Sequence, residues 1–371
     1  MSQTLYIGVM SGTSLDGVDS ALIGFEDSNI TLIDHDFFAM PKDLKQDVLD
    51  MCMGQATTLK KVGKLDHKLG HLFAAAVKQL LAKTNHAAKQ ITAIGSHGQT
   101  VYHQPTGDSP FTMQIGDANI IASETGITTI ADFRRKDMAL GGQGAPLVPA
   151  FHSIVFPVQE STCVVLNIGG IANISVLRKD QPVIGYDTGP GNMLMDAWIE
   201  KHSGKKYDKD ASFALTGKVH DGLLKLLLSD PYFLLPAPKS TGRELFNLPW
   251  LETKLTQINT PISAQDVQAT LARYTATSIA NEVTKYRQGP KPELLLCGGG
   301  SHNPLLVSTL KTLLAVWDVK LTNEKGIDCD YMEAIAFAWL AQRRVNNLPS
   351  NLPDVTGASK LASLGVIYPA D

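Results

Sequence analysis

The sequence is poor in several features, and each shortage excludes a class of protein. Its formal net charge of −3 lacks the basic excess of a nucleic-acid-binding surface. No apolar run approaches the roughly 20 residues of a membrane helix, and no signal peptide opens the chain. We therefore expect a cytoplasmic protein with no nucleic-acid and no membrane partner. The cysteines form no C-x-x-C pair and lie at no zinc spacing; they are Cys52, Cys163, Cys297 and Cys329.

What the chain does contain is enough apolar sequence for a large core. It has 371 residues, of which 44% are hydrophobic and 19% charged, and this length suits roughly two domains of about 150 residues each. Apolar runs typical of strands alternate with segments of helical periodicity such as 59–83, and Ser263 is placed to cap a long helix. The alternation predicts an α/β fold.

One arrangement occurs twice along the chain. "YIGVMSGTSLDGVDSALI" near the N-terminus and "VVLNIGGIANISVL" from residue 164 both read as strand, small polar turn, strand. Such an echo predicts a duplicated fold with one hairpin in each half. The Gly- and Pro-rich "MALGGQGAPLVPA" suggests a boundary, so we expect a first domain over 1–140 and a second over 141–349. The tail, 350–371, would return to the first domain as a strand.

Three turns rich in glycine follow strands, at Ser11–Asp19, Gly169–Asn173 and Gly298–His302. Backbone N–H groups in such turns bind anions, because no Cβ blocks close approach. None of the turns is a Walker A loop or a G-x-G-x-x-G fingerprint. One such turn would be an ordinary tight turn, but two hairpin turns and a late strand–GGG–helix in this order indicate a site for the phosphates of ATP.

The same pattern resembles the actin, sugar-kinase and Hsp70 ATPase superfamily, whose ribonuclease H-like fold has two domains with duplicated mixed sheets and a central ATP cleft. Within it, the chain resembles the anhydro-N-acetylmuramic acid kinase family. The motifs that carry this resemblance run from the first strand to the last helix: "GVMSGTSLDGVD", "GSHGQTVYHQP", "ADFRRKD", "LNIGGIANIS", "YDTGPGN", "CGGGSHN" and "YMEAIAFAWLA".

The resemblance implies a kinase that opens the 1,6-anhydro ring of anhydro-N-acetylmuramic acid with water and phosphorylates O6 from ATP. It further implies a role in recycling the bacterial cell wall, and a homodimer. It places the catalytic base at Asp187 and a supporting carboxylate at Glu333. The residues alone leave two alternatives open: that Asp187 only hydrogen-bonds its own turn, and that Asp330 and Glu333 form a capping box.

The expected ATP-binding residues come from the three turns. In the first turn, main-chain and hydroxyl donors lie beside the carboxylates of Asp16 and Asp19. Carboxylates next to the phosphates of ATP require a cation between them, so we expect Asp16 to contact Mg²⁺ indirectly. The alternative is that Asp16-Gly17 is only a turn dipeptide. The complete set is Gly12, Thr13, Ser14, Leu15, Asp16, Gly17, Val18, Asp19, Gly169, Gly170, Asn173, Gly298, Gly299 and Gly300.

Substrate contacts are expected from two further motifs. In "GSHGQTVYHQ", His97 and Gln99 suit sugar hydroxyls, although His97 and His103 also suit a hydrogen-bonding pair in a loop. In "ADFRRKD", one of Arg134 and Arg135 would bind the lactyl carboxylate of the anhydro amino sugar, since arginine binds carboxylates through two parallel hydrogen bonds. The sequence does not say which of the two.

Two rival functions remain. One is an ATP-driven clamp without a chemical product, which would need a peptide-binding domain or assembly loops beyond the two expected domains. The other is a relative that phosphorylates an ordinary sugar or acetate, or cleaves polyphosphate. ATP turnover that requires the anhydro sugar would distinguish all three.

Overall fold

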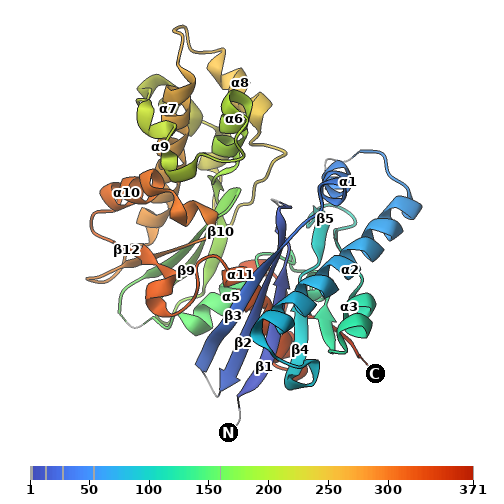
Figure 1. Cartoon of the computed structure of the whole chain (residues 1–371). Helices are drawn as coiled ribbons and strands as arrows, with labels where there is room; N and C mark the ends of the chain where they lie inside the picture. The colour runs from blue at the N-terminus through green and yellow to red at the C-terminus, as the bar shows by residue number, and fades with distance from the viewer. Residues whose placement is uncertain (1–2, 13–14, 27–28, 53–54, 159, 371) are drawn as a thin grey trace. The chain divides into compact units, whose positions relative to one another are not determined.

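The computed structural model describes residues 3–12, 15–26, 29–52, 55–158 and 160–370. These residues form two compact units (Figure 1). The first combines residues 1–155 with 331–371, and the second is the continuous segment 156–330.

The first unit is built on a mixed sheet of six strands in the order β13-β7-β4-β1-β2-β3. β1, β2 and β3 form an antiparallel meander, while β4 pairs parallel to β1 and β7 pairs parallel to β4. β5 and β6 form a separate antiparallel ribbon. The strands are β1 (Thr4–Met10), β2 (Gly17–Glu26), β3 (Asn29–Ala39), β4 (Ile91–Ser96), β5 (Gln99–Gln104), β6 (Phe111–Ile115), β7 (Thr129–Ala131) and β13 (Val366–Tyr368).

Helices cover both faces of this sheet. Ile7 and Val9 of β1 pack in one apolar core with Leu65 and Leu69 of α2, and side chains alternate between the faces of a strand. The intervening Gly8 therefore faces the other way, where α11 contacts β1 and β4. The helices of the unit are α1 (Lys42–Cys52), α2 (Leu59–Thr84), α3 (Ala118–Thr125), α4 (Phe133–Ala139), α5 (Val148–Val155), α11 (Met332–Val345) and α12 (Pro353–Thr356).

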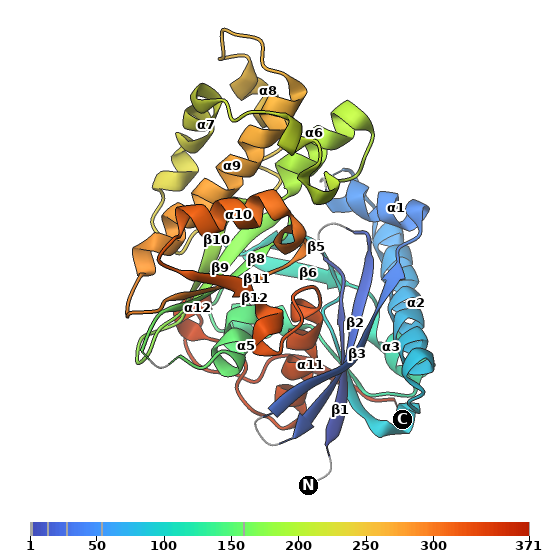
Figure 2. The same cartoon turned by 60° about the vertical axis from the view of Figure 1, so that its left-hand side comes forward.

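The second unit has a five-stranded sheet in the order β10-β9-β8-β11-β12. Helices α6 to α9 gather together, as Figure 2 shows, and α9 contacts α6, α7 and α10. The strands are β8 (Cys163–Ile168), β9 (Ile171–Leu177), β10 (Ile184–Pro190), β11 (Glu293–Cys297) and β12 (Asp318–Leu321). The helices are α6 (Met193–Ser203), α7 (Asp221–Leu228), α8 (Leu248–Leu255), α9 (Ala264–Val283) and α10 (Pro304–Leu313).

Both sheets follow one plan. In each, three consecutive strands form an antiparallel meander, and two later strands add in parallel beside the first strand of that meander. The predicted α/β fold with duplicated mixed sheets is confirmed. So is the helix cap at Ser263, whose side chain accepts from the Asp266 N–H.

The limits of the units differ from the expected boundaries at 140/141 and 349/350. Residues 141–155 stay with the first unit because Phe151 of α5 packs on Trp339 of α11, with ring centroids 5.8 Å apart. Residues 331–349 belong there because α11 packs on β1 and β4. The tail completes the sheet, since β13 pairs antiparallel with β7.

Two further features concern the cysteines and membrane spans. Cys52, Cys163, Cys297 and Cys329 form no disulfide, and the last three are buried. Among the described residues, no helix has the length and apolarity needed to cross a bilayer.

The packing of α11 on the first sheet predicts which glycine tolerates a methyl group. A Cβ on Gly8 would lie 1.7 Å from the Ala334 carbonyl oxygen, which is main chain and cannot move aside. We expect Gly8→Ala to lower the free energy of unfolding by about 3 kcal/mol, the upper part of the usual overpacking range. Gly63→Ala on the exposed face of α2 is the control and should raise it by up to about 1 kcal/mol. Urea denaturation measures both, and equal stability of the two variants would contradict this packing.

Candidate functional site

The opening turn is shorter than the sequence suggested. Gly17, Val18 and Asp19 belong to strand β2, and the Val18 side chain is fully buried. Leu15 adopts the left-handed conformation, its N–H lies 3.3 Å from the Gly12 carbonyl, and its side chain is buried in the core. Thr13 and Ser14 lie outside the described residues. The turn is thus anchored in the core through the Leu15 side chain.

Two side chains tie this turn to its surroundings. The Ser11 hydroxyl donates to Gln99 Oε1 at 2.7 Å, and both residues are buried. Asp16 is exposed, and its Oδ1 lies 2.8 Å from Lys45 Nζ. Gln99 therefore supports the turn, and Asp16 already has a cationic partner on α1.

In the second unit, main-chain hydrogen bonds hold the β8–β9 turn against the start of α6. The Asn192 N–H donates to the Gly169 carbonyl at 2.8 Å, and the Gly191 N–H donates to the Gly170 carbonyl at 2.9 Å. Asn173 lies within β9, opposite Asn167. Both glycine carbonyl groups of the turn are therefore bound by main-chain N–H groups just before α6.

The third turn, after β11, is held differently. The Gly298 N–H donates to the Cys329 carbonyl at 2.8 Å. Gly298 and Gly300 are needed for packing, because a Cβ would lie 2.2 Å from Asn167 Oδ1 at Gly298 and 2.3 Å from Ile168 Cγ2 at Gly300. Packing within the fold therefore requires glycine at these two positions.

Packing does not require glycine at four other positions in the turns. Around Gly12 and Gly299 an added Cβ would meet no described atom within 4 Å, and at Gly169 and Gly170 its nearest neighbours lie at 3.5 and 3.8 Å. None of the four has a positive φ. Each of the three turns thus contains glycine where the chain alone would accept a side chain. Glycine at these positions leaves the backbone open to close approach by a ligand.

Asp187 lies in β10 at an irregularity in the pairing with β9, between Asp187 and Gly189. Such a bulge redirects a side chain. Its Oδ2 accepts from the Ser240 hydroxyl at 2.9 Å and from the Thr241 N–H at 3.0 Å. No described residue donates to Oδ1. The alternative that this carboxylate binds its own turn is therefore wrong, because its donors come from a loop more than fifty residues away.

The environment of Asp187 favours proton uptake. Burial is the largest influence and raises the pKa of the carboxyl above its ordinary value, and the charge of Glu244 acts in the same direction. The hydrogen bonds from Thr241 and Ser240 oppose this and lower the pKa. A carboxylate with one unbound oxygen and a raised pKa is suited to general base chemistry.

Glu333 lies in the first turn of α11, and its pKa is raised by burial while the charge of Arg134 opposes the rise. The helix begins after Tyr331, which makes no side-chain cap. The capping-box alternative is therefore wrong, and the Asp330 carboxylate instead lies 2.7 Å from His302 Nε2.

Arg134 and Arg135 have different surroundings. Arg134 donates to His97 Nε2 through Nη2 at 2.9 Å and to the Gly144 carbonyl through Nη1 at 2.9 Å. Arg135 is exposed and pairs with Asp132. Burial, aided by Arg134, lowers the pKa of His97 to about 3, so its neutral ring accepts from the guanidinium. His103 has a different partner, Thr112, with His103 Nδ1 and Thr112 Oγ1 3.0 Å apart.

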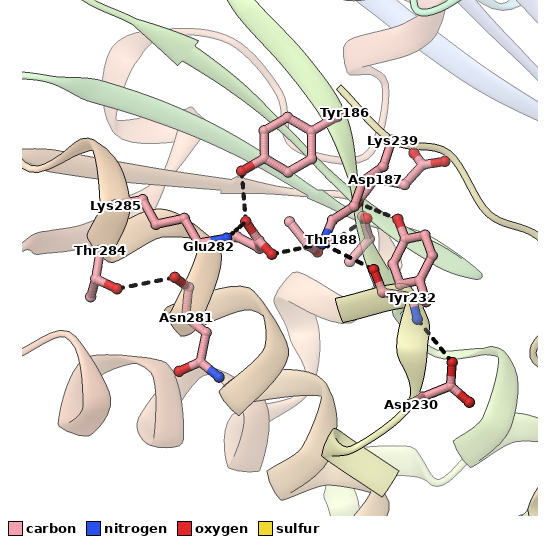
Figure 3. A network of polar contacts seen from close by, with 11 residues as sticks. Tyr186, Asp187, Thr188, Asp230, Tyr232, Lys239, Asn281, Glu282, Thr284 and Lys285 are labelled. Carbon is pink, nitrogen blue, oxygen red and sulfur yellow. Dashed lines mark hydrogen bonds and ion pairs between the residues drawn. The ribbon is translucent and has the colours of Figure 1, made fainter. Parts of the chain in front are cut away.

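Sequence reasoning missed the segment that holds Asp187. Tyr232, Lys239, Ser240 and Thr241 surround this residue, and Figure 3 shows the first two beside it. They come from a stretch, "PYFLLPAPKSTG", whose composition reads as a loop. The only signal was a lysine between proline and hydroxyl residues, which is not specific.

Comparison with known proteins supplies the family context. A sequence model of the anhydro-N-acetylmuramic acid kinase family matches residues 4–370. A protein of that name from Vibrio parahaemolyticus is 64% identical over 98% of both chains, and one from Vibrio cholerae is 63% identical over 99% of both. Among solved structures, an activator of 2-hydroxyisocaproyl-CoA dehydratase from Clostridium difficile with bound ADPNP aligns with a TM-score of 0.46 at 10% identity, over 92% of this chain and 96% of that one.

The third turn offers two adjacent glycines with opposite expectations. Gly300→Ala places a Cβ 2.3 Å from Ile168 and 2.9 Å from Asn192 Oδ1, and should lower the free energy of unfolding by about 1–3 kcal/mol. In Gly299→Ala the added Cβ has no described atom within 4 Å, so the free energy of unfolding should stay within about 0.5 kcal/mol of the wild-type value. Urea denaturation of the two variants measures the difference, and a destabilised Gly299→Ala would show that the fold itself requires this glycine.

Proposed function

Because this chain belongs to the anhydro-N-acetylmuramic acid kinase family, we propose that it opens the 1,6-anhydro ring of anhydro-N-acetylmuramic acid and phosphorylates the sugar from ATP. The product is N-acetylmuramic acid 6-phosphate. The observation that carries the proposal is Asp187, a half-buried carboxylate with a raised pKa, two donors on Oδ2 and none from the described residues on Oδ1.

In the proposed reaction, Asp187 Oδ1 accepts a proton from a water molecule as that water attacks C1 of the sugar. The C1–O6 bond breaks, and its electron pair stays on O6. O6 then attacks the γ-phosphorus of ATP, and ADP leaves. The Ser240 hydroxyl and the Thr241 N–H hold Oδ2, so that the carboxylate presents its other oxygen to the water. General base catalysis of this kind contributes about 10²–10⁴-fold.

The nucleotide would be held by main-chain donors of the glycine-rich turns. This assignment is supported by four glycines at which a Cβ would fit, so that packing does not require glycine there: Gly12, Gly169, Gly170 and Gly299. Phosphoryl transfer depends mainly on positioning and charge stabilisation, so several weak donors suit it. Thr13 and Ser14 would add hydroxyl donors.

Mg²⁺ would supply charge neutralisation at the phosphates. Because Lys45 occupies one oxygen of Asp16, Asp16 would contact the ion through water rather than directly. The proposal also includes a cytoplasmic homodimer acting in the recycling of cell-wall sugar, and these features rest on the family alone.

On the substrate side, Arg134 is the better of the two arginines for the lactyl carboxylate. Arg135 is already paired with Asp132 at the surface. Arg134 is held by His97 and by the Gly144 carbonyl, and Glu333 lies within range of its charge. We assign sugar contacts to His97 and Arg134, with Glu333 orienting the water. Gln99 is assigned a sugar contact in addition to its bond with Ser11.

The first test is product formation. Incubation with Mg-ATP and the anhydro sugar should release ADP and yield the 6-phosphate, as followed by mass spectrometry. Asp187→Asn should lower kcat by about 10²–10⁴-fold. Asp180→Asn makes the same chemical change in an exposed turn and should have no effect. ADP release without a sugar product would favour the clamp, and a fully active Asp187→Asn would exclude this residue as the base.

The pH dependence follows from the same carboxyl group. The base must be ionised, and burial raises its pKa above the ordinary 3.8. Activity is therefore complete at high pH and is lost as the pH falls through the raised pKa. We expect the acidic limb of kcat/KM at a pH clearly above 3.8, since this ratio reports groups of the free enzyme. Undiminished kcat/KM down to pH 4 in folded protein would contradict it.

A further inference from the structure

A buried ion pair lies behind the loop that holds Asp187. Lys239 Nζ and Glu282 Oε1 are 2.9 Å apart, and the side chains are only 3% and 4% exposed. Lysine and glutamate are almost never buried so completely unless they are paired. Glu282 lies near the end of α9, whereas Lys239 comes from an irregular segment without a helix or strand of its own.

Glu282 is fully supplied with donors. Besides Lys239, the Tyr186 hydroxyl donates to Oε2 at 2.8 Å and Lys285 Nζ donates to it at 2.6 Å (Figure 3). Burial opposes ionisation, but these three bonds together lower the pKa of Glu282. The carboxylate is therefore a fixed anionic anchor on a long helix, and Lys239 is attached to it.

The loop attached in this way surrounds Asp187. The Asp187 N–H donates to the Lys239 carbonyl at 3.0 Å. The next two residues, Ser240 and Thr241, make the two bonds to its carboxylate. Three consecutive residues, Lys239, Ser240 and Thr241, thus make these three hydrogen bonds with Asp187.

The other side of Asp187 is connected to the same lysine. The Tyr232 hydroxyl donates to the Asp187 carbonyl at 2.5 Å. Lys239 Nζ lies 4.8 Å from the centre of the Tyr232 ring, within cation–π distance, and 3.4 Å from the Tyr232 carbonyl oxygen. The lysine side chain therefore fixes both the loop in front of Asp187 and the tyrosine behind it.

We propose that the Lys239–Glu282 pair is a positioning device for Asp187, which holds the loop donors on Oδ2 and thereby leaves Oδ1 aimed at the attacking water. This inference rests on the proposed function, in which Asp187 is the base. Lys239 and Glu282 are positioning residues and do not touch the substrate. A displacement of about 1 Å in a reacting group costs about 10²-fold in rate, so the anchor has a measurable effect.

The test uses a double variant because Glu282→Gln alone would leave the buried Lys239 charge without its ionic partner, and Lys239→Met alone would leave Glu282 Oε1 without its donor; both endanger folding. Lys239→Met with Glu282→Gln removes both charges and keeps similar side-chain volumes. We expect a thermal midpoint near that of the wild type, an ATP KM within about threefold, and a kcat for ring opening reduced by about 10²-fold. Lys285→Met is the matched control, because Lys285 binds the same carboxylate but is 53% exposed and comes from the 3-10 turn after α9 rather than from the loop. Its kcat should stay at the wild-type level.

The pH profile separates positioning from general loss of structure. The bonds from Thr241 and Ser240 lower the pKa of Asp187, so a loosened loop should move the acidic limb of kcat/KM to higher pH. Glu244, the acidic group that also acts on Asp187, and the Tyr232 phenol are unchanged in these variants. A smaller folded fraction would instead scale the whole profile without moving the limb.

The outcomes distinguish the inference from the function on which it rests. If Asp187→Asn is inactive while the double variant matches the wild type in kcat and in its acidic limb, the positioning role is overturned and the base remains. If Asp187→Asn is as active as the wild type, the base assignment falls, and the positioning role falls with it. A slow double variant with a shifted limb and a normal thermal midpoint supports the inference.

Discussion

The Glu282 carboxylate sets the strictest requirement in the second unit. A charge removed from water needs donors on both oxygens, and here they come from strand β10, from the 3-10 turn Thr284–Tyr286 that follows α9, and from a distant loop. Tyr186, which meets one oxygen, directly precedes Asp187 in β10. Satisfying this one buried charge therefore determines where the strand, the loop and the end of α9 meet, and Asp187 lies at that meeting point.

Glycines in this chain fall into two groups with different causes. At Gly8 and Gly300, neighbouring atoms leave no space for a Cβ, so packing alone requires glycine. At Gly12 and Gly299 the space is open. At the second group the backbone is open to close approach, which is what the proposed binding of nucleotide phosphates without a Walker A loop requires. Sequence patterns cannot distinguish the groups, because both appear simply as glycine.

Much of the fold could be predicted because its signals are local. The strand–turn–strand echo and the helical periodicity of α2 each lie within one segment, and they indicated the duplicated sheets. The support of Asp187 could not be predicted, because Lys239 and Glu282 come together only through tertiary packing across more than forty residues. The partner of Arg134 could not be predicted for the same reason, because His97 lies 37 residues away along the chain, whereas Arg135 pairs with Asp132 at the local i,i+3 spacing.

The first unit is assembled from both ends of the chain. Buried Asp137 accepts from Asn351 and from Thr356, at 2.9 and 2.8 Å, and α11 and β13 complete its sheet and one covering layer. The second unit is continuous from 156 to 330. During synthesis on the ribosome, which proceeds from the N-terminus, the inserted unit has all its residues before its host does. The strands around β1 must therefore wait, with the face at Gly8 uncovered, until the last segment of the chain emerges.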